Sequence, residues 1–72
     1  MRVRVDNPAL VPELVAFLER QERGAVTADV GAGVAEVSLL GSYRDEAMRM
    51  RLYLLVRSWE AGETGRAAEI LA

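Results

Sequence analysis

The side chains that could do chemistry in this chain are eleven carboxylates and nine arginines, beside a few hydroxyl groups. Histidine, cysteine and lysine are absent from the 72 residues. This removes the usual neutral-pH base, the thiol nucleophile, the common zinc ligands and the Schiff-base amine. A P-loop also requires a lysine. We therefore expect a protein that is not an enzyme and has no cofactor.

The carboxylates lack the spacing of an acid–base pair or a metal site. Asp45 and Glu46 are adjacent at a predicted helix start, where negative charge favours the helix dipole. Glu60 and Glu63 flank a predicted helix end without the spacing of a calcium loop. Folding could still bring two carboxylates together, but so short a chain has little room for a pocket of about 300 Å³ unless two subunits share it. The spacing of the carboxylates therefore favours a role at helix ends and predicts neither catalysis nor a metal site.

Three arginines, Arg44, Arg49 and Arg51, are close together near the start of the same predicted helix. They are the candidate anion-binding residues of a small regulatory module that binds an anionic ligand or nucleic acid. Local pairing with Asp45 and Glu46 is the alternative. A formal net charge of −2 gives no general attraction for nucleic acid or for anionic membranes. Nucleic acid is therefore the less favoured partner.

Hydrophobic spacing predicts the elements around these residues. Residues 2–5 alternate arginine and valine, which predicts a short strand. Asp6 or Asn7 can cap a helix that begins at Pro8 and ends near Arg23, with Pro12 disfavouring regular helix before it. A second helix, capped by Ser42 with Asp45 and ended by Gly62, has a core-facing stripe at helical spacing. The stripe contains Met48, Leu52, Leu55, Val56 and Trp59.

Residues 25–40 predict a β-hairpin. With Gly31 and Ala32 as the central residues of a type II′ turn, Val26 faces Val37 and Ala28 faces Ala35, so one face is apolar. A three-residue turn would set Ala28 against Glu36 and mix the two faces. The predicted register leaves the opposite face without an aromatic residue for stacking nucleic-acid bases. That face contains Arg2, Arg4, Thr27, Asp29, Glu36 and Ser38, with Val34 and Leu40 at its ends.

The order βαββα predicts an α+β two-layer sandwich in a single domain of residues 1–72. Its three-stranded mixed sheet has the order 1-3-2, and both helices cover the face with Val3, Val5, Val26 and Ala28. This topology resembles the ferredoxin-like fold without its last strand, and by itself it implies no function. Residues 64–72 predict a short helix, with a fourth strand as the alternative, because alanine and glutamate are depleted in strands. Without that strand, residues 2–5 form a sheet edge.

The function we favour is a non-enzymatic protein-interaction or structural module, acting as a homodimer or as a subunit of a larger assembly. One small core is available and no disulfide can reinforce it. The predicted interface lies on the open sheet face, the edge of residues 2–5 or an apolar set on the second helix, which could instead pack on the first helix. The candidate interface residues are Arg2, Arg4, Glu36, Met50, Tyr53 and Leu54. The lack of a signal peptide or membrane span predicts a cytoplasmic location.

Overall fold

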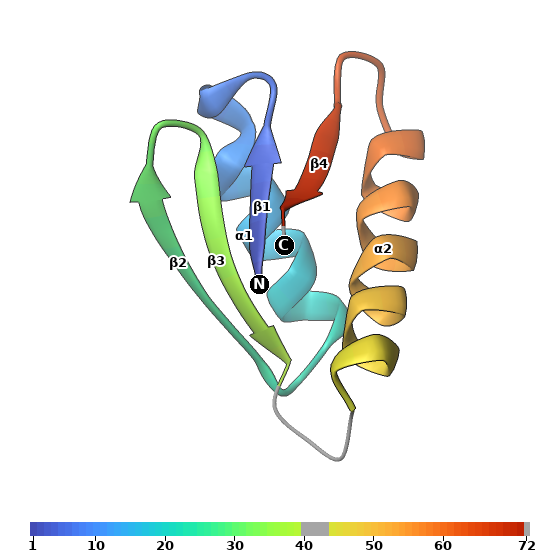
Figure 1. The fold of residues 1–72 in the computed structure, drawn as a ribbon. Coiled ribbons are helices and arrows are strands. Elements are labelled where there is room, and N and C mark those ends of the chain that lie inside the picture. The colour runs from blue at the N-terminus through green and yellow to red at the C-terminus, as the bar shows by residue number, and fades with distance from the viewer. Residues whose placement is uncertain (40–43, 72) are drawn as a thin grey trace.

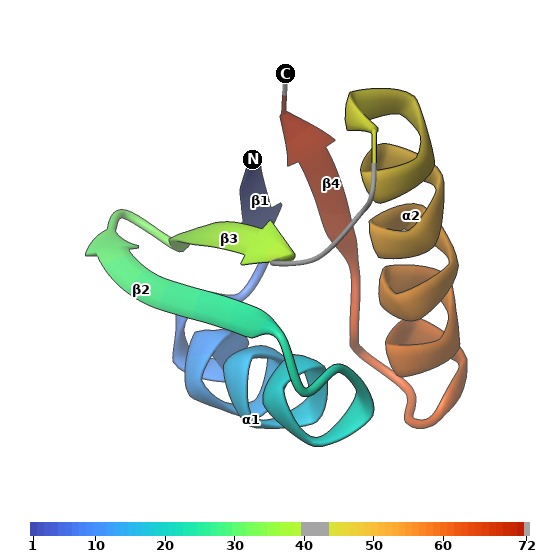
Figure 2. The ribbon, with the colours of Figure 1, turned by 90° about the horizontal axis from the view of Figure 1, so that it is seen from below.

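A computed structural model describes residues 1–39 and 44–71. It is an α+β structure with a four-stranded sheet of order β2-β3-β1-β4, in which all neighbouring strands are antiparallel. Figures 1 and 2 show α1 and α2 on the same side of this sheet, with α1 below β2 and β3 and α2 beside β4. The elements are β1 (Arg2–Val5), the 3₁₀ helix η1 (Pro8–Leu10), α1 (Val11–Gln21), β2 (Ala25–Gly31), β3 (Val34–Leu39), α2 (Asp45–Ala61) and β4 (Ala68–Leu71).

The prediction of a three-stranded mixed sheet is wrong in two respects, although the order of its three strands is confirmed. The C-terminal residues form β4, which pairs with β1, so the strand alternative applies and not the favoured helix. The sheet is also fully antiparallel, because β3 lies between the two parallel strands β1 and β2. As a result β1 is a central strand and not an edge. This arrangement does not contradict the resemblance to the ferredoxin-like fold, and it contains the fourth strand that was the alternative prediction for the C-terminal residues.

The hairpin register differs from the predicted one by one residue. Thr27 pairs with Val37 and Ala28 pairs with Glu36. The turn centres on Ala32 and Gly33, whose φ angles of 56° and 76° are both positive, as a type I′ turn requires. A β-bulge between Asp29 and Gly31 then places one extra residue on β2. The turn position and the bulge together produce the register in which Ala28 faces Glu36, which the sequence pattern disfavoured because it mixes the two faces.

This register moves the β2 side chains to the opposite faces. Val26 is 53% exposed and Ala28 is also exposed, so neither contributes to the core as predicted. Thr27, predicted on the open face, instead donates a hydrogen bond from its hydroxyl to Glu19 Oε1 of α1 at 2.7 Å. The apolar residues that the hairpin buries come from β3: Ala35, Val37 and Leu39.

The start of the first helical segment agrees with the sequence pattern. The Asn7 side chain accepts a hydrogen bond from the Ala9 amide at 3.1 Å, which caps η1. Pro12 lies in the first turn of α1, where its missing N–H removes no helical hydrogen bond. The helix ends at Gln21, two residues before the predicted end at Arg23.

The second helix also agrees with the predicted pattern, apart from its cap. Four of the five predicted core residues are buried, Met48 is partly buried, and α2 ends at Ala61 before Gly62. The predicted cap Ser42, like Leu40, lies outside the described residues. The N-cap of α2 is Arg44, which makes no side-chain capping bond. Among the described residues no polar or charged residue is buried, and the buried hydrophobic core consists of Val3, Val5, Val11, Leu14, Leu18, Ala35, Val37, Leu39, Leu52, Leu55, Val56, Trp59 and Ala68.

Candidate interaction surfaces

The outer face of α2 carries the largest exposed apolar side chains of this helix. Met50 is 67% exposed, Leu54 is 55% exposed and Tyr53 is 49% exposed. Helical spacing places Met50 and Leu54 opposite the buried stripe that contains Leu52 and Trp59. The alternative in which this apolar set packs against α1 therefore does not apply.

The open face of the sheet carries two cross-strand ion pairs. Arg2 Nε lies 3.0 Å from Glu36 Oε2 on β3, and Arg4 Nη2 lies 2.7 Å from Glu69 Oε2 on β4. All four side chains are about half exposed, so solvent screens both pairs and each contributes little to stability. The six predicted interface residues thus lie on two surfaces: Arg2, Arg4 and Glu36 on the sheet, and Met50, Tyr53 and Leu54 on α2.

The pKa of Glu36 on this face is lowered by its neighbours. The hydrogen bond from Arg2 is the main cause that lowers the pKa of Glu36, and it outweighs the opposing loss of hydration. The ammonium group of Met1, 3.4 Å from Glu36 Oε1, acts in the same direction. Both contacts stabilise the carboxylate form in the folded protein.

This lowered pKa predicts a small stabilisation at neutral pH that acid removes. The stabilisation is complete above the ordinary pKa of 4.5 and declines as the pH falls through the lower value of the folded state. We expect Glu36→Gln to lower the urea midpoint at pH 6 and to have a smaller effect at pH 3. The difference should shrink in 1 M NaCl, because salt screens exposed charges. Equal effects of the substitution at both pH values would contradict this prediction.

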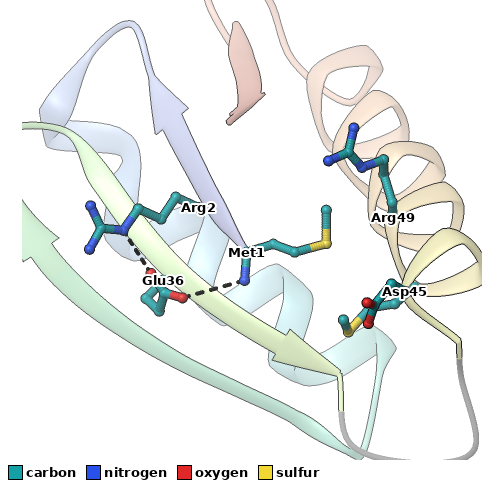
Figure 3. A pocket seen from close by; sticks show the side chains of 6 residues that line it. Met1, Arg2, Glu36, Asp45 and Arg49 are labelled. Carbon is teal, nitrogen blue, oxygen red and sulfur yellow. Dashed lines mark hydrogen bonds and ion pairs between the residues drawn. The ribbon is translucent and has the colours of Figure 1, made fainter. Parts of the chain in front are cut away.

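A hollow of about 400 Å³ lies between the start of β1 and the start of α2. Figure 3 shows Glu36 with Arg2 and the Met1 amine on one side, and Asp45 with Arg49 on the other. The two carboxylates come from opposite walls, and the described residues contain no group of three potential metal ligands. This hollow therefore brings carboxylate and guanidinium groups from two walls together.

A second hollow, of about 440 Å³, forms a groove between α2 and β4. The guanidinium group of Arg57 lies 5.0 Å from the centre of the Tyr53 ring and forms an ion pair with Glu60 at 2.8 Å. Arg49 lines both hollows. Sequence reasoning missed this groove because one of its walls is β4, for which a helix was favoured over a strand. The groove is lined by Arg49, Tyr53, Arg57, Ala68, Glu69 and Ile70.

The three predicted anion-binding arginines do not converge on one point. Arg51 forms an ion pair with Glu22, the residue that follows α1. Arg49 lies two residues away along α2, so it points to the opposite flank, roughly 160° around the helix axis. That flank faces the groove beside β4. Arg44 is exposed at the N-cap of α2. Of the three, Arg49 is the one placed in a hollow.

Within the described residues, no helix has the length and apolar character needed to cross a membrane. Comparisons with known proteins found no matching family model, no matching curated protein and no matching solved structure.

Proposed function

We propose that this protein is a non-enzymatic interaction module that forms a homodimer through the outer face of α2. One observation carries the proposal: an exposed apolar stripe, interrupted at Arg57 and Ser58, on the side of the helix that faces away from the core. Exposed apolar patches of this kind commonly mark protein–protein contacts. The stripe consists of Ala47, Met50, Leu54 and Ala61, all exposed.

The two alanines of the stripe lie symmetrically about Leu54, which favours a second copy as the partner. Ala47 and Ala61 each lie seven residues, about two helical turns, from Leu54. An antiparallel pair of α2 helices would therefore pack Leu54 on Leu54 and Ala47 on Ala61 of the partner. In a two-fold symmetric dimer every such contact occurs twice. The small alanines at both ends let the helix axes approach closely.

The size of the helix limits the strength of this association. A helix of 17 residues is about 25 Å long. One face of such a helix covers less than the roughly 800 Å² per partner of a standard interface. We therefore expect a reversible dimer with a Kd in the range of about 1–100 μM, corresponding to roughly −8 to −5.5 kcal/mol.

Sedimentation equilibrium over a range of protein concentrations tests this proposal. The wild type should pass from monomer to dimer, and Leu54→Arg should remain a monomer because the dimer would bury two unpaired charges. The matched control is Val26→Arg, since Val26 is also about half exposed but lies on the open sheet face. Val26→Arg should dimerise like the wild type. A wild type that stays monomeric at millimolar concentration would refute self-association, and loss of the dimer in Val26→Arg alone would assign it to the sheet face.

A further inference from the structure

We infer that the groove between β4 and α2 binds an extended acidic peptide segment of another protein, which adds to β4 as a fifth strand. This inference goes beyond the proposed homodimer and does not depend on it. The groove lies on the flank of α2 that faces β4, whereas the dimer would use the outer stripe centred on Leu54. Three features of the groove support the inference: its backbone groups, its side-chain spacing and its charge.

The outer edge of β4 offers unpaired backbone groups. The Asp6 amide donates to the Ala67 carbonyl at 3.0 Å, so these two residues form a hydrogen-bonded pair. Hydrogen-bonded and non-hydrogen-bonded pairs alternate along antiparallel strands. The backbone N–H and C=O of Glu69 therefore point toward β1, and those of Ala68 and Ile70 point toward the outer edge. The Ala68 amide donates to Glu60 Oε2 at 2.9 Å. The Ile70 N–H and C=O have no partner in the described part of the chain. An added strand could bond both of these groups.

The wall formed by α2 has the repeat of an extended strand. Arg49, Tyr53 and Arg57 are four residues apart along the helix, which corresponds to about 6 Å per step. Alternate side chains of a strand are about 6.7 Å apart. Figure 1 shows α2 and β4 running side by side. Successive side chains on one face of an added strand would therefore meet Arg49, Tyr53 and Arg57 in turn.

The charge of the groove selects an acidic segment. Glu69 is already paired with Arg4, and Arg57 is paired with Glu60. Arg49 has no ion pair among the described residues, so the groove has an unmatched positive charge in a chain of net charge −2. A carboxylate opposite Arg49, a second one near Arg57 and an apolar side chain over Tyr53 would complement this wall. The expected ligand pattern is acidic–x–apolar–x–acidic.

Fluorescence anisotropy with a labelled peptide of the sequence Ser-Glu-Ser-Leu-Ser-Glu-Ser tests the inference. We expect saturable binding to the wild-type protein, and Arg49→Gln should weaken it by about tenfold, the loss expected for one exposed charge contact assisted by a hydrogen bond. The matched control Arg20→Gln removes an exposed arginine of α1 and should bind like the wild type. Leu54→Arg should also bind normally, so failure of the dimer and failure of the groove are distinguishable.

Three altered peptides and one oligonucleotide separate the parts of the inference. Replacing both glutamates of the peptide with glutamine should abolish binding, and undiminished binding would refute the charge argument. Two further peptides carry N-methyl groups on one or the other set of alternate amides. One of them should fail to bind, because it lacks the N–H that donates to the Ile70 carbonyl. Undiminished binding of both N-methylated peptides would refute strand addition. Binding of single-stranded (dT)₁₂ without binding of the peptide would overturn the inference in favour of nucleic acid.

Discussion

Replacing Leu52 with alanine is expected to leave the protein largely unfolded at 25 °C. Leu52 is completely buried on the core-facing side of α2. Truncating a buried leucine costs about 2–5 kcal/mol, from the lost transfer energy and the cavity left behind. A core of this size supplies only about 3–5 kcal/mol of net stability without disulfides or partners. The expected loss is therefore comparable to the whole free energy of unfolding.

Urea denaturation followed by Trp59 fluorescence measures this effect. Trp59 is the only tryptophan and is 1% exposed, so its emission should shift to longer wavelength on unfolding. The matched control is Leu54→Ala, which makes the same change two residues away on the exposed side of α2. In dilute protein, where association does not contribute, Leu54→Ala should cost about 0.5 kcal/mol or less. Similar losses for Leu52→Ala and Leu54→Ala would contradict the assignment of the two helix faces.

Gly33→Ala is expected to destabilise the protein by about 2–4 kcal/mol, combining backbone strain with a steric clash. Gly33 has a φ of 76°, which is unfavourable for a residue with a Cβ atom. A Cβ at this position would lie 3.0 Å from the Val5 carbonyl oxygen and 3.4 Å from Pro8 Cγ. The Val5 amide donates a hydrogen bond to the Gly33 carbonyl at 2.8 Å, so the backbone has little room to move away.

Gly31→Ala separates the two contributions. Gly31 has a similar φ of 86°, but a Cβ there would meet no atom within 4 Å. We expect this variant to lose only the roughly 1–2 kcal/mol of the backbone term. Parallel urea denaturations of the two variants and the wild type give the comparison. An equal loss in both variants would show that the close approach of Gly33 to β1 adds no cost.

The sequence was most informative where local pattern and burial agree. The alternation of residues 2–5, the Asn7 cap and the apolar stripe of α2 each predicted an element that the structure contains. The outer apolar set of α2, with Met50 and Leu54, was also visible in the sequence. Whether this set is buried could not be decided from spacing, because that depends on where α1 packs.

The hairpin shows where an argument from hydrophobic pattern fails. The pattern favoured a register that buries Val26 and Ala28, yet both are exposed. Three consecutive residues with positive φ and the bulge after Asp29 set the register instead. The positive φ of Ala32 could not be anticipated from the sequence, because a non-glycine residue rarely adopts a φ near 56°. Turn geometry therefore outweighed the gain from burying two small side chains.

The last strand depends on contacts that are remote in sequence. Residues 68–71 have a composition that disfavours strands. They nevertheless pair with the edge of β1 that β3 leaves open, with Leu71 opposite Arg2 and Ala68 opposite Val5. The preceding loop is held by Arg66, whose guanidinium group packs 4.9 Å from the Trp59 ring and donates to the Trp59 carbonyl at 3.0 Å. These contacts bring the end of the chain back to β1.

The sequence by itself determined the α+β class, the order of the first three strands, the buried face of α2 and the absence of histidine, cysteine and lysine chemistry. Only the tertiary structure decided that β1 is central, that Arg4 pairs with Glu69 and that Arg49 faces a groove. The physical reason is the range of the interactions. Helix stripes and caps depend on residues a few positions apart, whereas an added strand, a shifted register and a groove depend on groups that meet only after the chain has folded.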